Sequence, residues 1–185
     1  MTEVNRPKLT GIVEMDETYV GGRAHGKRGR GAANKEVVIG IRQRQGELRF
    51  FHAEDARSGT LEKYIRENIS DDVDILMTDD LHLYKGAARH LRKQNKHKTI
   101  RHNYGIYVQG DVHTNTVESA FGLLKRGVLG TWHRISAKHL QSYCDEMCFR
   151  FYNRKNPYLF RDTILKLISS QNLEYKELVA ENTAA

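Results

Sequence analysis

Hydrophobic and polar residues alternate along three neighbouring segments near the start of the chain. Residues 11–20 (GIVEMDETYV), 37–43 (VVIGIRQ) and 48–53 (LRFFHA) follow the period of two that is typical of β-strands. A Gln45-Gly46 turn separates the second segment from the third. Three strands in immediate succession predict an antiparallel meander.

Helical and extended segments alternate in the next part of the chain. Ser58 is suited to cap a helix whose apolar residues recur at helical spacing (Leu61, Tyr64, Ile65 and Ile69). A short apolar strand is expected over residues 73–78 (VDILMT), then a helix over 84–93 and a short strand over 99–102. This alternation after a meander predicts a mixed sheet whose faces are covered by helices.

Three further apolar stripes at helical spacing follow in the second half of the chain. The first covers residues 117–128, and the second covers residues 140–151 behind Ser136, which is suited to cap it. Asn156-Pro157 interrupts the pattern, and a last helix is expected over residues 159–168. The stripes predict helices that bury one face each.

A length of 185 residues suits one domain with a sizeable core. We assign residues 1–155 to this domain and residues 156–185 to a C-terminal helix and polar tail. Cys144 and Cys148 lie within an apolar stripe and are expected to be buried free thiols, not zinc ligands. No apolar run reaches the length of a membrane span and no signal peptide opens the chain, which favours a cytoplasmic protein without a membrane partner.

The charge of the chain is +7 and its sequence pI is about 9.4, and the charges are segregated. Residues 23–35 contain five Lys or Arg and no acid, and residues 81–110 contain seven Lys or Arg and no acid. Acidic residues gather instead within residues 54–80. This segregation predicts a basic surface for a polyanionic partner, most often nucleic acid.

Three acidic residues fall on different predicted elements whose order can bring them together. Asp16 lies inside the first strand, Asp79 follows the fourth, and Glu118 lies on the helix after the fifth. In a mixed sheet the first and fourth strands can lie side by side with the late helix across them, so the three carboxylates would converge. Glu17 alternates with Asp16 and is expected to face the other way.

Glu118 lies at the border of an apolar helical stripe, and a half-buried carboxylate there needs a cation. Lys125, two turns later, is one candidate and a divalent metal is the other; an ordinary amphipathic helix is the plain alternative. Hard oxygen ligands select Mg²⁺ or Mn²⁺, and two such ions about 3.5–4 Å apart are the usual device for displacement at a phosphodiester.

Three segments resemble the catalytic domain of bacterial insertion-sequence DDE transposases of the ISXO-like group: VEMDETYVGG, TDDLHLYKG, and GDVHTNTVESAFGLLKRG with its continuation to FRFYNRK. The resemblance covers about residues 11–155. It implies an α/β, ribonuclease H-like fold, with a mixed five-stranded sheet flanked by helices and a C-terminal helical extension. It also implies that Asp16, Asp79 and Glu118 are the catalytic acids and the ligands of two Mg²⁺ or Mn²⁺ ions. Asp80 occupies a position at which the group tolerates other residues, so we prefer Asp79.

The same resemblance implies residues that bind DNA. Lys125 matches the basic residue that such enzymes place near the transferred DNA end, and Arg126 adjoins it. His113 and Asn115 match the polar lead-in of the third motif and would contact DNA or a ligand carboxylate; helix capping is the alternative. The basic loop would either touch DNA or form a solvated connection, and three arginines are its candidate contacts (Arg23, Arg28 and Arg30).

Two departures from the group are visible. The group usually carries an aromatic pair after the Glu-Ser of the third motif, and this chain has Ala120-Phe121, which we expect to change packing and not chemistry. Full-length members carry an N-terminal zinc ribbon, whereas this sequence has no CxxC pair ahead of its first strand. We therefore expect no zinc here and a catalytic domain from a truncated element.

The resemblance implies a DNA transposase domain that cuts a strand at an element end and joins the freed 3′-hydroxyl to target DNA. Its partners would be element ends, target DNA and further copies of the chain assembled on DNA, at the nucleoid of a bacterial cytoplasm. Two alternatives stay open: an idle DNA-binding remnant, and a ribonuclease H-like or junction-resolving nuclease. Only the transposase would join a 3′-hydroxyl to new DNA.

Overall fold

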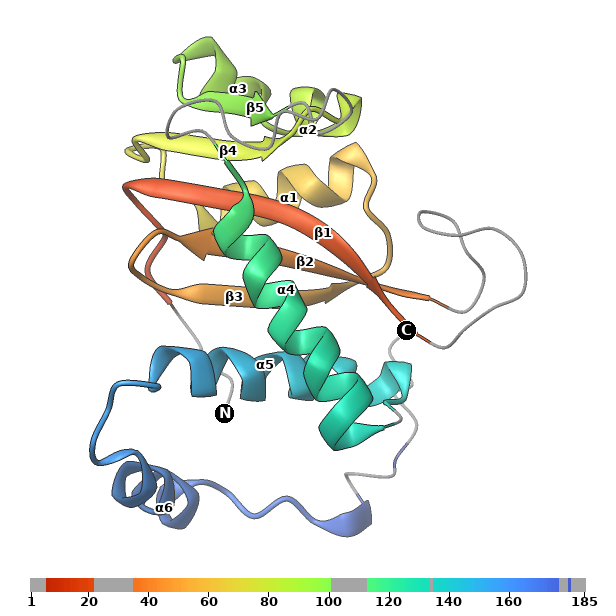
Figure 1. Cartoon of the computed structure of the whole chain (residues 1–185), viewed down its shortest axis with the longest axis vertical. Coiled ribbons are helices and arrows are strands. Elements are labelled where there is room, and N and C mark those ends of the chain that lie inside the picture. Colours follow the sequence, from red (N-terminus) through yellow and green to blue (C-terminus); the bar gives the residue numbers. More distant parts are fainter. Residues whose placement is uncertain (1–5, 22–34, 101–112, 134, 177–179, 181–185) are drawn as a thin grey trace.

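The computed structural model describes residues 6–21, 35–100, 113–133, 135–176 and 180. A five-stranded sheet forms the centre of the molecule, with helices on both of its faces (Figure 1). The predicted mixed α/β architecture is confirmed. No helix of the described residues is long and apolar enough to cross a membrane.

The sheet combines a meander with two parallel additions. β1 (Ile12–Val20), β2 (Glu36–Gln43) and β3 (Leu48–Ala53) pair antiparallel in succession. β4 (Ile75–Asp79) lies parallel to β1, and β5 (His97–Ile100) lies parallel to β4. The strand order β3-β2-β1-β4-β5 puts β1 in the middle, beside β4, as the sequence analysis expects.

One face of the sheet is covered by α1 (Ser58–Asn68), α2 (His82–Ala87) and α3 (Arg89–Lys93). Odd-numbered residues of β1 and β2 face this layer and form its core with apolar side chains of β4 and the helices (among them Met15, Ile39, Leu61, Leu76 and Tyr84). Glu17 shares this face and accepts a hydrogen bond of 2.7 Å from the Tyr84 hydroxyl, so the expectation that it points away from Asp16 is confirmed.

The opposite face is covered by α4 (Asn115–Gly127) and α5 (Leu140–Tyr152), with α4 running obliquely across the strands (Figure 1). A π-helical turn, η2 (Val128–Trp132), and a 3₁₀ turn, η3 (Ala137–His139), connect the two helices. Phe50 of β3 stacks on Phe121 of α4 with 5.3 Å between ring centroids. Cys144 and Cys148 are buried free thiols in this layer, as predicted, and burial raises the pKa of both.

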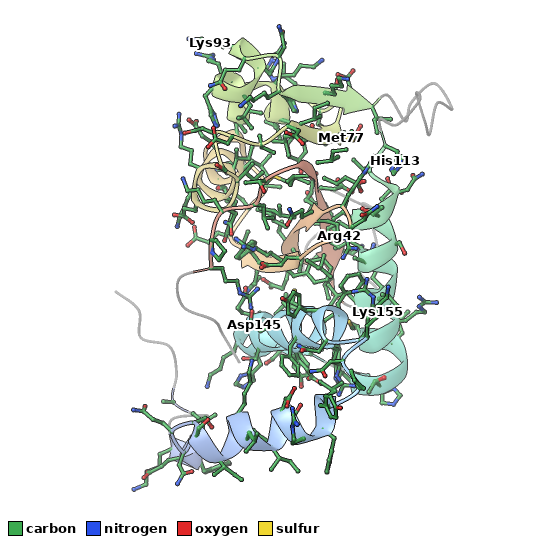
Figure 2. The ribbon with its side chains drawn as sticks, turned by 90° about the vertical axis from the view of Figure 1, so that its left-hand side faces the viewer. Arg42, Met77, Lys93, His113, Asp145 and Lys155 are labelled. Atoms are coloured by element: carbon green, nitrogen blue, oxygen red, sulfur yellow. The ribbon has the colours of Figure 1, made fainter. Side chains whose placement is uncertain are left out.

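The last helix, α6 (Leu159–Ser169), lies beyond α5, on the side away from the sheet (Figures 1 and 2). Its apolar side chains are largely exposed; Phe160 and Ile168 are 80% and 77% exposed.

Some local expectations are wrong. The helix predicted over residues 84–93 is two short helices joined at Ala88. Ser58 does not cap α1, because its hydroxyl donates to the Leu83 carbonyl at 3.1 Å. Ser136 makes no side-chain capping bond either. For Ser58, a tertiary contact replaces the local capping interaction.

Candidate active site

β1 and β4 bring two of the predicted acids to one face of the sheet. In their parallel register Glu14 lies beside Met77, and Asp16 and Asp79 follow two residues later on each strand. Because side chains of a strand alternate between faces, Asp16 and Asp79 share the face on which Glu14 lies. This is the face that α4 crosses.

Gly40 of β2 lets α4 approach the sheet closely. Gly40 lies opposite Asp16 in the antiparallel register, and a Cβ built on it would lie 2.6 Å from Cζ of Phe121 and 2.9 Å from Cγ2 of Val117. Any larger residue would push the helix outward. Because Gly40 has no side chain, the segment of α4 that carries Glu118 can lie close to the strands beside Asp16.

The three predicted acids interact electrostatically. The pKa of Asp16 is raised from 3.8 to about 8 by burial and, to a smaller extent, by the charges of Glu17, Glu118 and Asp79, while a backbone hydrogen bond from Glu17 lowers it. Burial is the largest of these causes. The negative charges of Asp79 and Glu118 act on the Asp16 carboxyl, so the structure brings the three groups together.

Glu118 itself is exposed, so the expectation of a half-buried carboxylate is wrong. The helix turns the apolar residues Val117 and Phe121 to the sheet and leaves Glu118 toward solvent, where its Oε1 accepts a hydrogen bond of 2.8 Å from the Thr114 hydroxyl. Lys125 and Arg126 are exposed on the last turn of the same helix. An exposed carboxylate does not need Lys125 as a buried partner.

Asp79 and Asp80 differ in their surroundings. Oδ1 of Asp80 lies 2.8 Å from Nζ of Lys85 and accepts a hydrogen bond of 3.2 Å from Thr99. Asp79 accepts a hydrogen bond of 2.6 Å from the backbone N–H of Asp80. Because Asp80 is held in an ion pair on its own side, Asp79 is the stronger candidate ligand.

Glu14 is a residue of this site that the sequence analysis left without a role. Its side chain is fully buried, and its Oε2 accepts hydrogen bonds from the backbone N–H of Thr116 (2.9 Å), the Thr116 hydroxyl (2.7 Å) and the N–H of Val117 (3.1 Å). These are N–H groups of the first turn of α4, which have no partner within the helix. Glu14 of β1 therefore caps the helix that carries Glu118, and the available sequence signal was an acid on the same strand face as Asp16.

Arg44 completes this contact. Its Nε donates to Oε1 of Glu14 at 2.7 Å, and its Nη2 reaches the His113 carbonyl at 3.2 Å and Sδ of Met77 at 3.3 Å. One buried ion pair thus connects the end of β2 to β1, β4 and the start of α4. Glu14 and Arg44 thereby contact the start of the helix that carries Glu118.

The remaining predicted residues have different environments. His113 is partly buried, with its Nδ1 3.4 Å from Oε1 of Glu14, and Asn115 is the exposed first residue of α4. The N-cap is Thr114, which makes no side-chain capping bond, so capping by His113 or Asn115 is not observed. Three arginines of the basic loop lie outside the described residues (Arg23, Arg28 and Arg30).

The acids fit a divalent cation by their chemistry. Among the residues that the structure describes, no three His, Cys, Asp or Glu side chains are arranged to hold a metal ion. Asp16 and Asp79 nevertheless share one face of the sheet, the charges of Asp79 and Glu118 both act on Asp16, and carboxylate oxygens are the donors that Mg²⁺ and Mn²⁺ prefer.

A mixed sheet of order 3-2-1-4-5, with acids on its two central parallel-paired strands and on the helix across them, defines the ribonuclease H-like class of DDE transposase domains. The model of one family, the ISXO2-like transposase domain, matches residues 8–152. The chain belongs to this family. No curated protein matches the sequence.

Proposed function

We propose that this domain cuts DNA at the end of a mobile element and joins the freed 3′-hydroxyl to target DNA, with Asp16, Asp79 and Glu118 as its catalytic acids. The observation that carries the proposal is the parallel register of β1 and β4, which puts Asp16 and Asp79 on the sheet face that α4 crosses, with the charges of Asp79 and Glu118 both acting on Asp16. Three carboxylates in one site repel one another, and a bound cation would offset this repulsion. Membership of a transposase family indicates that the substrate is DNA.

The three carboxylates are the groups that would hold Mg²⁺ or Mn²⁺. When bound, a pair of such ions supplies activation of the attacking hydroxyl and stabilisation of the leaving oxygen. Glu14 and Arg44 would act as positioning residues, because they hold the first turn of α4. Lys125 and Arg126 would bind phosphates of the DNA backbone without reading its sequence.

The reaction would have two chemical steps. Water attacks a phosphodiester at the element end, the P–O bond to the 3′ oxygen breaks, and a 3′-hydroxyl leaves. That hydroxyl then attacks a target phosphodiester, forms a new P–O bond and displaces another 3′-hydroxyl. Assembly of several copies on DNA, to hold two ends at once, is part of this proposal.

Nicking of supercoiled plasmid in Mn²⁺ tests the assignment. Asp79→Asn and Glu118→Gln are expected to lose at least about 100-fold in nicking rate, the upper range for loss of a residue that supports a metal site. DNA affinity should stay equal or rise, because a negative charge is removed. The matched controls are Asp80→Asn, one residue away in an ion pair, and Glu146→Gln, an exposed acid on α5.

Wild-type nicking rates in Asp79→Asn or Glu118→Gln would contradict the assignment. If the wild-type chain binds DNA and does not nick it, the idle remnant is the better description. If it nicks and never joins a labelled 3′-hydroxyl end to plasmid, the nuclease alternative is correct.

A further inference from the structure

A basic pocket lies beside the first turn of α4. Its volume is about 690 Å³, and it is lined by the end of β2 and its turn, the start of α4 and the segment after α5 (Arg42, Arg44, Gln45, His113, Thr116, Arg154 and Lys155). Among the residues that the structure describes, none that lines the pocket is acidic. Figure 2 shows Arg42 between His113 and Lys155, along the side of the molecule where α4 lies.

Arg42 is a buried cation without a hydrogen-bond partner for two of its nitrogens. The residue is 7% exposed, and its Nε and Nη1 are buried and unpaired. Its guanidinium lies 4.2 Å from the ring centroid of Phe151. A buried N–H donor of a charged group costs free energy when it has no hydrogen-bond acceptor. The two unpaired nitrogens of Arg42 therefore indicate an acceptor that enters from outside.

A second guanidinium strengthens the need for an anion. Arg154 also lies 4.2 Å from the Phe151 ring centroid. Burial and the Arg154 charge lower the pKa of Arg42, whereas the Glu14 carboxylate raises it. Among the described residues, no carboxylate forms an ion pair with Arg42, Arg154 or Lys155. The charge of Arg44, by contrast, is already matched by Glu14.

We propose that this pocket binds a phosphate group of the DNA backbone next to the catalytic carboxylates. The inference rests on the proposed function for the identity of the DNA. Arg42 lies opposite Glu14 in the sheet register. Asp16 lies two residues beyond Glu14 on β1, which is a rise of about 7 Å along that strand. Thr116 lines the pocket and lies on the first turn of α4, as Glu118 does, so the pocket adjoins the helical turn that carries the third acid.

The chemistry of the pocket suits a phosphate that remains attached to a chain. Arginine forks bind phosphate oxygens through paired N–H donors, and the His113 ring can add a hydrogen bond. A volume of about 690 Å³ exceeds what one inorganic phosphate fills, which leaves room for the adjoining sugar. The pocket would therefore fix the register of the strand, and the carboxylates would act on a phosphodiester nearby.

Thermal unfolding in sodium phosphate, compared with sodium chloride at equal ionic strength, tests the anion site without DNA. The wild-type chain should gain melting temperature in phosphate, and Arg42→Gln and Arg154→Gln should lose that gain. Arg154 is exposed, so its variant keeps the test valid where Arg42→Gln fails to fold. The control is Arg161→Gln, which removes a guanidinium 4.5 Å from the Tyr158 ring on α6, outside the pocket.

Fluorescence anisotropy with a labelled 30-base-pair duplex, without divalent ions, tests the DNA part. Arg154→Gln should weaken binding at least about fivefold and reduce the slope of log affinity against log salt by about 1. Arg161→Gln should change affinity by less than about twofold, since the position contributes only to the general field.

Equal losses in Arg154→Gln and Arg161→Gln would overturn the pocket, because general charge would then explain both. A lost phosphate response with unchanged DNA binding would overturn the DNA assignment and leave a site for a free small anion. The proposed function fails separately: a chain that binds DNA through Arg154 and never nicks it keeps the pocket and loses the catalytic proposal.

Discussion

Removal of the Glu14 charge should destabilise the protein more than any other single Glu→Gln change in the described structure. The carboxylate is fully buried, lies 2.7 Å from Arg44 Nε and accepts two backbone N–H bonds at the start of α4. Breaking a buried pair by neutralising one partner leaves the other charge uncompensated and costs about 3–5 kcal/mol. Glu14→Gln keeps an acceptor for the helix, so this range is the whole expected loss in free energy of unfolding.

Urea unfolding followed by circular dichroism measures the loss. With an m-value of about 2 kcal/mol/M, the expected shift of the midpoint is about 1.5–2.5 M. The matched control is Glu62→Gln, which removes an exposed partner of Arg66 one turn away and should cost about 0.5 kcal/mol or less.

A double-mutant cycle with Arg44→Gln separates the pair from the cap. The double variant should lose less than the sum of the single variants, because neither side then retains an unpaired buried charge. A midpoint shift below about 0.5 M for Glu14→Gln, with an unchanged m-value, would refute the reasoning. Strict additivity in the cycle would refute the role of the ion pair and leave only the cap.

Three further predictions concern packing and pH. Gly40→Ala should cost about 1–3 kcal/mol and slow nicking, because the added Cβ meets α4, whereas Gly59→Ala, with open space around it, should be neutral or stabilising. Burial lowers the pKa of His97 to about 4, so the folded protein keeps this side chain neutral while the unfolded chain protonates it near pH 6.5. The free energy of unfolding should therefore fall by up to about 1.4 kcal/mol per pH unit from pH 6.5 to 4. Urea titrations of His97→Gln should show a flatter dependence on pH. The pKa of Asp16 is raised to about 8, so the unfolded chain releases this proton at lower pH than the folded protein does, and stability falls as pH rises from about 4 to 8. Calorimetry without divalent ions should show that Asp16→Asn melts at a higher temperature than wild type at pH 8 and at the same temperature at pH 3.5.

The strands and their faces could be predicted because alternation fixes them locally. β3 has the predicted bounds. Asp16 and Asp79 share a face because each lies two residues beyond one member of the Glu14–Met77 pair, and side chains two residues apart on a strand point the same way. Helix starts could not be predicted in this way. Ser58 has the right chemistry for a cap, but its hydroxyl contacts Leu83, which no local pattern announces.

The third acid shows where the sequence pattern stops. The helical wheel puts Glu118 at a border, whereas in the structure Val117 and Phe121 pack closely over Gly40 and Glu118 faces solvent. Glu14 was visible as an acid beside Asp16 on one strand face, but its partners are backbone N–H groups of a distant helix. Contacts to a backbone leave no trace in the identity of the contacted residue, so the role of Glu14 required the structure.

The bond between Glu14 and Thr116 joins positions 102 residues apart, which has a consequence for synthesis of the protein. At about 5–20 residues per second, a ribosome needs about 5–20 s to add this stretch. Throughout that interval β1 carries its acid while the helix that completes the set does not yet exist. The buried Glu14 carboxylate therefore has no helix N-terminus to cap until α4 has been made, so β1 and α4 can join only late in synthesis of the chain.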